Sequence, residues 1–405
     1  MKKTPLEKRI KRRVTARKQL FFAVTPPGLK RLCHREISRL PLALEEITMI
    51  PGGVEFKGSL PDCYAASLHL RSPSRITMRI ARFKAENFRT LEKKLNAVEW
   101  ELYLSRKFPV ECEVSTHHSR LYHKDAIAER TEAAVRERLE SLDQGPPKAS
   151  GKPGSGTTPA KSRHSPFTLF IRAQDDQFEI SLDASGELLH KRGIKKEVGK
   201  APLRENLAFA VLSAAGFTGE GPLVDPMCGS GTFSMEGTMI KQNIPPGFFR
   251  PFAFEKWPCF SRGQWRHLKQ EAEKAIIAPE TPEIFASDLD ETVLGHLQRG
   301  LTECGIAGGI SVFRENFFDL DPRILTGKKG VVVLNPPYGK RIGNQNDVQA
   351  FFARIGDHLK EKFTGWQAGI VLPDKGLVST LPFSAALTPV FHGGLEIFIA
   401  AGKIR

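Results

Sequence analysis

The side chains best suited to chemistry in this 405-residue sequence are Asn335, Pro336, Pro337 and Tyr338, which directly follow the apolar run at 331–334. An exocyclic amine of guanine or adenine is a weak nucleophile, because its lone pair is delocalised into the ring. The Asn335 side-chain oxygen and the Pro336 carbonyl can each accept one amine hydrogen, while Tyr338 can stack on the base. The pattern predicts methylation of a base amine, although Asn-Pro-Pro is also a turn that ends buried strands.

A glycine-rich turn lies upstream, between a short apolar run at 221–224 and a stretch at 233–241 that is typical of a helix. Gly229 and Gly231 allow a ligand to approach the backbone, and the helix start adds the positive end of its dipole. A nicotinamide site is disfavoured, because Ser234 replaces the third glycine of G-x-G-x-x-G and the next acidic strand end comes far later. The residues predicted to bind a cofactor here are Asp225, Pro226, Cys228, Gly229, Ser230, Gly231 and Thr232.

A second group of acids follows the next predicted strand. Asp288 at the end of that strand could accept hydrogen bonds from ribose hydroxyls, with Leu289 beside it. Capping of the helix expected at 291–301 is the alternative role for Asp288 and Asp290.

The sequence offers no sign of a metal site or of covalent catalysis. Its six cysteines are scattered without a C-x-x-C pair, which predicts reduced thiols. Cys228 lies in the glycine turn, but methylation of an amine needs no covalent intermediate, so a small residue beside the cofactor is the better interpretation. His117, His118 and His123 have no partner at ligand spacing, and we therefore expect no metal.

Together these motifs resemble the class I S-adenosylmethionine-dependent methyltransferases, specifically the THUMP-domain RNA guanine-N2 methyltransferases that include bacterial 23S rRNA enzymes. The stretches that carry the resemblance are 201–208 (APLRENLA), 225–237 (DPMCGSGTFSMEG), 244–247 (IPPG), 252–257 (FAFEKW), 335–343 (NPPYGKRIG) and 391–396 (FHGGLE). The resemblance implies S-adenosylmethionine as cofactor and RNA as partner. It also implies cofactor contacts from Asn335 and from the end of the third strand, where Asn316 and Phe317 stand, with Glu315 as the alternative.

The activity implied by the resemblance is direct methyl transfer to the N2 amine of a guanine, with 23S rRNA as the expected substrate. Three alternatives stay open: transfer RNA as substrate, adenine N6 as acceptor, and a degenerate domain that only binds RNA. The intact glycine turn and Asn335 argue against the last of these.

Composition agrees with an RNA-binding enzyme. The 60 lysine and arginine residues outnumber the 45 acidic ones and give a net charge of +15, which suits a polyanionic partner. Residues 1–18 hold nine of these cations against one glutamate, and we expect them to form a disordered arm that meets RNA. No segment fits a secretory signal or a membrane span, so we expect a cytoplasmic protein. We also expect it to be a monomer.

The predicted fold class is α/β: a Rossmann-like, doubly wound methyltransferase domain after an α+β ferredoxin-like and THUMP region that binds RNA. The expected divisions are an arm at 1–18, a ferredoxin-like unit at 19–70, a THUMP domain at 71–185 with a flexible insert at 144–166, a connector at 186–200, and the methyltransferase domain at 201–405. Aromatic residues within 244–277 are expected to pack over the catalytic sheet. The cations expected to contact RNA, or else to form solvated helix faces, are Arg71, Arg79, Arg82, Arg120, Lys124, Arg130, Arg136 and Arg138.

Overall fold

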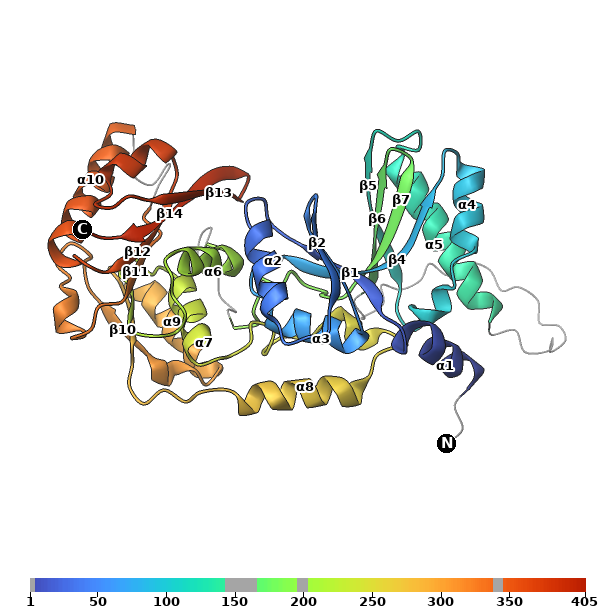
Figure 1. Ribbon diagram of the computed structural model, residues 1–405, viewed down its shortest axis with the longest axis horizontal. Helices are drawn as coiled ribbons and strands as arrows, with labels where there is room; N and C mark the ends of the chain where they lie inside the picture. Colours follow the sequence, from blue (N-terminus) through green and yellow to red (C-terminus); the bar gives the residue numbers. More distant parts are fainter. Residues whose placement is uncertain (1–3, 143–165, 195–202, 338–344) are drawn as a thin grey trace.

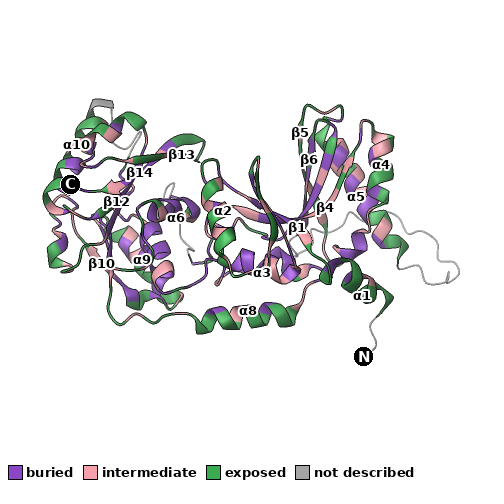
Figure 2. Ribbon diagram, viewed as in Figure 1, coloured by how far each residue is buried: buried purple, intermediate pink, exposed green. Residues whose placement is uncertain are grey.

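The computed structural model describes residues 4–142, 166–194, 203–337 and 345–405. The molecule is elongated and has two seven-stranded sheets. The second sheet lies at one end, and the first sheet runs from the middle, where β1 and β2 lie, to the other end (Figure 1). Helices α4 and α5 turn their buried sides to the first sheet and their exposed sides to solvent (Figure 2). Within the described ranges, no helix is long and apolar enough to cross a bilayer.

The first sheet has the order β2-β3-β1-β4-β7-β6-β5. The strands of this sheet and the helices that connect them are β1 (Gln19–Val24), α2 (Lys30–Arg39), β2 (Glu45–Ile50), β3 (Gly53–Gly58), α3 (Leu60–His69), β4 (Arg75–Lys84), α4 (Phe88–Asn96), β5 (Val110–His117), α5 (Lys124–Ser141), β6 (Phe167–Gln174) and β7 (Gln177–Asp183). Strand β4 pairs with β1 along 75–78 and with β7 along 77–84. It therefore belongs to both predicted N-terminal units, which share one sheet across the expected boundary at 70.

The N-terminal arm is ordered from residue 4, which corrects the prediction of disorder. Helix α1 (Pro5–Ile10) is capped by Thr4 and continues into a π-helical turn at Lys11–Thr15. Ile10 and Val14 are buried in the N-terminal core. Arg9 also donates to Glu99 and Glu101 at 2.6 Å each. The segment is thus held by two buried apolar residues four positions apart and by the carboxylates of Glu99 and Glu101, although its charge alone indicated disorder.

The second sheet has the order β10-β9-β8-β11-β12-β14-β13. Its elements are α6 (Glu205–Ala214), β8 (Leu223–Asp225), α7 (Thr232–Lys241), α8 (Arg262–Lys274), β9 (Ile284–Asp288), α9 (Glu291–Glu303), β10 (Ile310–Arg314), β11 (Val331–Leu334), α10 (Gln345–Lys362), β12 (Gln367–Leu372), β13 (Ala386–His392) and β14 (Leu395–Lys403). The first five strands of the order are parallel and β14 is antiparallel to β12. The winding reverses between β8 and β11, and ligands bind at such switch points in doubly wound folds.

The long segment between α7 and β9 joins the two halves of the molecule. Phe254 in this segment stacks on Tyr64 of α3 at 4.6 Å between ring centroids, and Trp265 of α8 meets both rings edge to face. The aromatic residues of 244–277 were predicted to pack over the second sheet. Phe248 and Phe249 do pack against the core of that sheet, whereas Phe252, Phe254 and Trp257 belong to the N-terminal core. The segment therefore fixes the N-terminal half of the molecule relative to the second sheet.

Candidate functional site

The predicted site residues gather at the carboxyl edge of the second sheet. Asp225 is the last residue of β8 and pairs in register with Ala286 of β9, while Asp288 ends β9 beside Arg314 of β10. Asn335 follows β11, the strand on the other side of β8. Because parallel strands end at one edge, the glycine turn, Asp288 and Asn335 surround the switch point between β8 and β11.

A buried carboxylate holds the glycine turn in shape. Asp225 is fully buried, and its Oδ2 accepts from the Ser234 amide at 3.1 Å and from the Ser234 hydroxyl at 2.6 Å. Gly231 has φ +70°, and a Cβ there would lie 2.4 Å from Leu297 of α9. From the sequence alone, Ser234 was noted only because it replaces the third glycine of the G-x-G-x-x-G pattern. A hydroxyl nine residues after a strand-ending aspartate was the signal for this contact.

Gly229 leaves space for a ligand. Its φ is +50°, and a Cβ placed on it would meet nothing within 4 Å. The Gly229 amide donates to Asp288 Oδ2 at 2.8 Å, and the Asp290 amide donates to Asp288 Oδ1 at 3.1 Å. A carboxylate has about four acceptor positions, so Asp288 retains capacity for ribose hydroxyls. Asp290 caps α9 through Thr292, as one of the two alternatives predicted.

The remaining residues of the predicted cofactor set line or support this edge. Leu289 is 59% exposed, which is unusual for a large apolar side chain and suits packing against a flat adenine. Pro226, Gly231 and Thr232 are buried, and Cys228 is 8% exposed, while Gly229 and Ser230 are partly exposed. The open space at Gly229, the Asp288 carboxylate and exposed Leu289 together fit an adenosyl cofactor.

The segment after β10 is folded on itself. The Asn316 side chain donates to Asp319 at 3.0 Å and accepts from the Phe318 amide at 3.2 Å. Phe317 is buried against His358 at 4.7 Å between ring centroids. Glu315 Oε1 accepts from the Asn316 amide at 3.0 Å. The Phe317 ring therefore belongs to the core, and the adenine contact stays a prediction for Asn316 or Glu315.

Asn335 carries one of several buried side-chain atoms that lack a hydrogen-bond partner among the described residues. Its side-chain oxygen is buried and accepts no hydrogen bond from any described residue. Pro336 is buried and Pro337 exposed, and Tyr338 lies outside the described residues. An unpaired buried oxygen costs about 1–3 kcal/mol, and a ligand bound at this edge of the sheet would supply the missing donor. An amine hydrogen of a substrate base or of the cofactor is such a donor.

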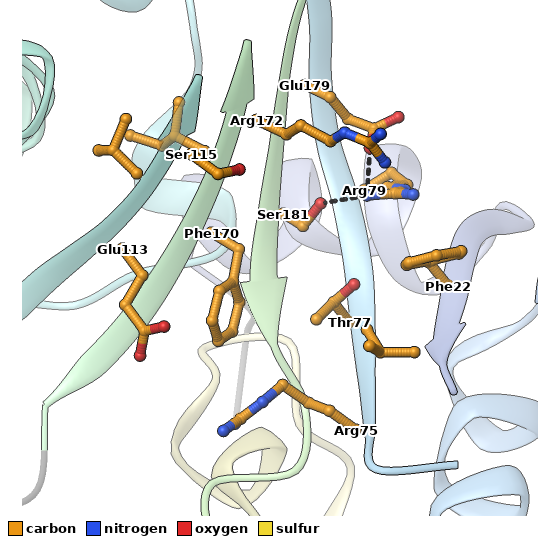
Figure 3. Close-up of a pocket in the computed structure, with 13 residues that line it drawn as sticks. Phe22, Arg75, Thr77, Arg79, Glu113, Ser115, Phe170, Arg172, Glu179 and Ser181 are labelled. Atoms are coloured by element: carbon orange, nitrogen blue, oxygen red, sulfur yellow. Dashed lines mark hydrogen bonds and ion pairs between the residues drawn. The ribbon is translucent and has the colours of Figure 1, made fainter. Parts of the chain in front are cut away.

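A separate hollow of about 290 Å³ opens on the first sheet, across β1, β4, β7, β6 and β5 (Figure 3). Phe22 and Phe170 line it from opposite sides. Arg79 lies over the Phe22 ring at 4.2 Å, donates to Ser181 at 2.9 Å and forms an ion pair with Glu179. This hollow is remote in the fold from the carboxyl edge of the catalytic sheet, and its central arginine is neutralised.

Most cations expected to contact RNA form ion pairs with carboxylates of the protein, and their contact with RNA stays a prediction. The pairs are Arg71 with Glu236, Arg79 and Arg82 with Glu55 and Glu179, Arg120 with Glu86, Arg130 with Glu92, and Arg138 with Glu101. Only Lys124 and Arg136 of the predicted set lack an ion pair within the described ranges. Sequence could not reveal the pairing because the carboxylates lie far along the chain.

Comparison with known proteins agrees with this geometry. Residues 192–385 match the RMKL-like methyltransferase domain, and residues 20–77 match the RlmL ferredoxin-like domain. A putative RNA methyltransferase of Synechocystis is 31% identical over 93% of this chain and 94% of its own length. The chain belongs to the RMKL-like methyltransferase family.

One further relative and one solved structure show how much of the chain the similarity covers. The ribosomal RNA large subunit methyltransferase K/L of Methylococcus capsulatus is 32% identical over 93% of this chain, which spans only 50% of that relative's length. A solved putative methyltransferase complexed with SAH is 26% identical, with a TM-score of 0.82 over 96% of this chain and 99% of that one. Membership of the RMKL-like family confirms the predicted fold class, the ferredoxin-like N-terminal unit and S-adenosylmethionine as the cofactor.

Proposed function

We propose that this RMKL-like methyltransferase methylates the N2 amine of a guanine in large-subunit ribosomal RNA. The observation that carries the proposal is the unpaired buried oxygen of Asn335, which lies at the switch point beside the open glycine turn. The K/L relatives support the choice of RNA, although this chain spans about half of their length. Ribosomal RNA as substrate also supports a cytoplasmic location.

The chain's own residues orient both reactants. Asn335 Oδ1 and the Pro336 carbonyl accept the two amine hydrogens, which draws the nitrogen towards tetrahedral geometry and stabilises the positive charge developing on it. The glycine turn, Asp288 and Leu289 hold the cofactor, which supplies an electrophilic methyl group when bound. The methylated nitrogen is acidic enough to lose its proton to water. No general base is therefore assigned.

The target base reaches Asn335 only when it is unpaired or turned out of its helix, because a paired base engages the same amine edge. Tyr338, outside the described residues, is the proposed stacking partner of the extruded base. Monomeric action and the absence of a metal stay predictions.

Adenine N6 is the second candidate acceptor. Asn335 and Pro336 offer only hydrogen-bond acceptors, and these serve the amine of either purine equally. The THUMP-like N-terminal region favours the guanine enzymes, because the resemblance to that group includes this region. Transfer RNA stays the alternative substrate within the same class.

The test uses full-length protein, labelled S-adenosylmethionine, and separate pools of unmodified ribosomal and transfer RNA, followed by digestion to nucleosides. We expect label in N2-methylguanosine from the large-subunit ribosomal pool. Label in N6-methyladenosine would establish the adenine alternative, and label confined to transfer RNA would change the substrate. No label in either pool would contradict the proposal.

A further inference from the structure

Helix α2 presents three arginines to solvent along one face. Arg31, Arg35 and Arg39 recur every four residues and are all exposed, whereas Cys33 and Ile37 on the opposite face are buried. None of the three arginines forms an ion pair with a carboxylate in the part of the chain that the structure describes. Their charges are therefore available to a partner, unlike those of the paired THUMP arginines.

The start of α2 is attached to the catalytic sheet. Gly28, two residues before the helix, has φ +91°, and a Cβ there would lie 2.1 Å from the Pro389 carbonyl oxygen of β13. Leu29 is buried in one cluster with Val390 of β13 and Ile397 of β14. Figure 1 shows the amino end of α2 beside the β13–β14 hairpin. The arginine face thus begins next to this hairpin.

The hairpin extends past the catalytic edge of the sheet. Leu372, the last residue of β12, pairs with Phe398, so the first three residues of β14 and their partners in β13 continue beyond β12. Phe391 is 45% exposed and Leu395 is 63% exposed in this extension. A Cβ on either glycine of the tip would meet nothing within 4 Å. An exposed aromatic ring therefore lies beyond the edge that carries Asn335.

We propose that the arginine face of α2 and the hairpin tip form one docking surface for the RNA next to the target nucleotide. The docking surface consists of Arg31, Arg35, Arg39, Phe391 and Leu395. The proposal rests on RNA being the substrate, as in the proposed function. It assigns the RNA contact to a helix and a hairpin that flank the catalytic edge, and not to the paired arginines of the THUMP-like unit.

The chemistry of the docking surface suits a polynucleotide. Eight residues of helix span about 12 Å, which is long enough to contact several successive phosphates of one strand. The arginines face the phosphates, and Phe391 stacks on an unpaired base, since aromatic rings bind single-stranded bases in this way. Stacking beside the target also supports the extrusion that Asn335 requires.

The first test removes charge. Arg31→Gln, Arg35→Gln and Arg39→Gln are combined in the full-length chain, and binding to a 23S rRNA transcript is measured against salt. We expect the slope of log affinity against log salt to fall by about 2 to 3, at 0.7 to 0.9 for each lost phosphate contact. The matched control removes three exposed cations of α4, Arg89→Gln, Lys93→Gln and Lys94→Gln. Equal changes in both variants, or none in the α2 variant, would overturn the proposal.

The second test removes the ring. Phe391→Ala should weaken RNA binding by roughly tenfold without changing the salt slope, because stacking involves no counterion release. Leu387→Ala, on the same strand and 39% exposed but further from the tip, is the control and should bind RNA as wild type does. Equal losses in the two variants would contradict the role of Phe391.

Failure of this proposal can be separated from failure of the proposed function. Methyl transfer by the wild-type protein to the same transcript tests the function, whereas the binding comparison does not depend on turnover. Transfer with no difference between the α2 and α4 variants overturns the docking surface alone. RNA binding that depends on α2, without any methyl transfer, overturns the proposed function alone.

Discussion

At the scale of single residues, Ser234 shows how a departure from a motif becomes part of the site. A glycine at this position would allow close packing of helix and strand, as in dinucleotide folds. Here the hydroxyl and amide of Ser234 both bind the buried Asp225 carboxylate. Asp225 therefore holds the start of α7 and with it the conformation of the glycine turn. We propose that Asp225 affects cofactor affinity through this conformation.

Ser234→Ala is expected to lower the free energy of unfolding by about 1–3 kcal/mol, because a buried carboxylate oxygen loses a donor. Cofactor affinity should fall as well, since the turn loses its support. Thr238→Val is the control, because this hydroxyl on the same helix donates only to a helix carbonyl. Calorimetry of S-adenosylmethionine binding and thermal unfolding measure both effects. Equal affinity losses in the two variants would show that Ser234 has no special role.

Asn335→Ala is expected to reduce the rate of methyl transfer by about 100-fold or more, as for other losses of one transition-state contact. Cofactor affinity should change by no more than a few-fold, because Gly229, Asp288 and Leu289 remain. Single-turnover transfer and calorimetry on the same sample separate the two quantities. Unchanged turnover would remove Asn335 from the active site.

At the scale of elements, the N-terminal helix α1 shows that high net charge alone does not predict disorder. Glu101, 2% exposed, accepts from Arg9 and also from Arg138 of α5 at 2.8 and 2.9 Å. Burial acts to raise the pKa of Glu101, but the hydrogen bonds from Arg138 and Arg9 outweigh it and hold this pKa at about 2. The carboxylate thus ties α1 to α5.

This pKa predicts an acid-sensitive attachment of α1. A folded-state pKa below the unfolded value of about 4.3 adds stability above pH 4.3, and that stability is lost as pH falls towards 2. Glu101→Gln should therefore melt below wild type at neutral pH, and the difference should shrink between pH 4.3 and 2. Glu129→Gln, on the exposed face of α5, is the control. A difference that does not depend on pH would contradict the assignment.

The elements were predictable where a local pattern sufficed. A few consecutive residues were enough to predict the strand before Asn335, the glycine turn and the strand before Asp288. Three other features depend on residues distant in sequence: that α1 is folded, that Phe254 packs on α3, and that Arg138 pairs with Glu101. Periodicity carries no information about such contacts, so the docked helix and the neutralised arginines required the structure.

At the scale of the whole molecule, buried charge joins the two halves. Glu236 of α7 is fully buried and accepts from Arg71 at 2.7 Å and from Arg192 at 3.2 Å. Burial acts to raise the pKa of Glu236, yet Arg192 and Arg71 hold it below its usual range. Arg71 also donates to the Ile244 carbonyl. The catalytic sheet is thereby held against the ferredoxin-like unit.

Glu236→Gln is expected to lower the free energy of unfolding by about 3–5 kcal/mol, because it leaves the buried Arg192 and the largely covered Arg71 without this counter-charge. Glu187→Gln removes an exposed ion pair with Lys191 and should cost at most about 1 kcal/mol. Denaturant unfolding of both variants measures the difference. Similar costs would show that the buried pair does not join the halves.

Strand β4 limits how such an enzyme can be recombined with others. Since its first residues pair with β1 and its last residues with β7, a chimera cut near residue 70 would place the β1 of one parent against the β4 of the other. Exchangeable modules would instead have to be cut beyond β7. The two N-terminal units would therefore have to be exchanged together.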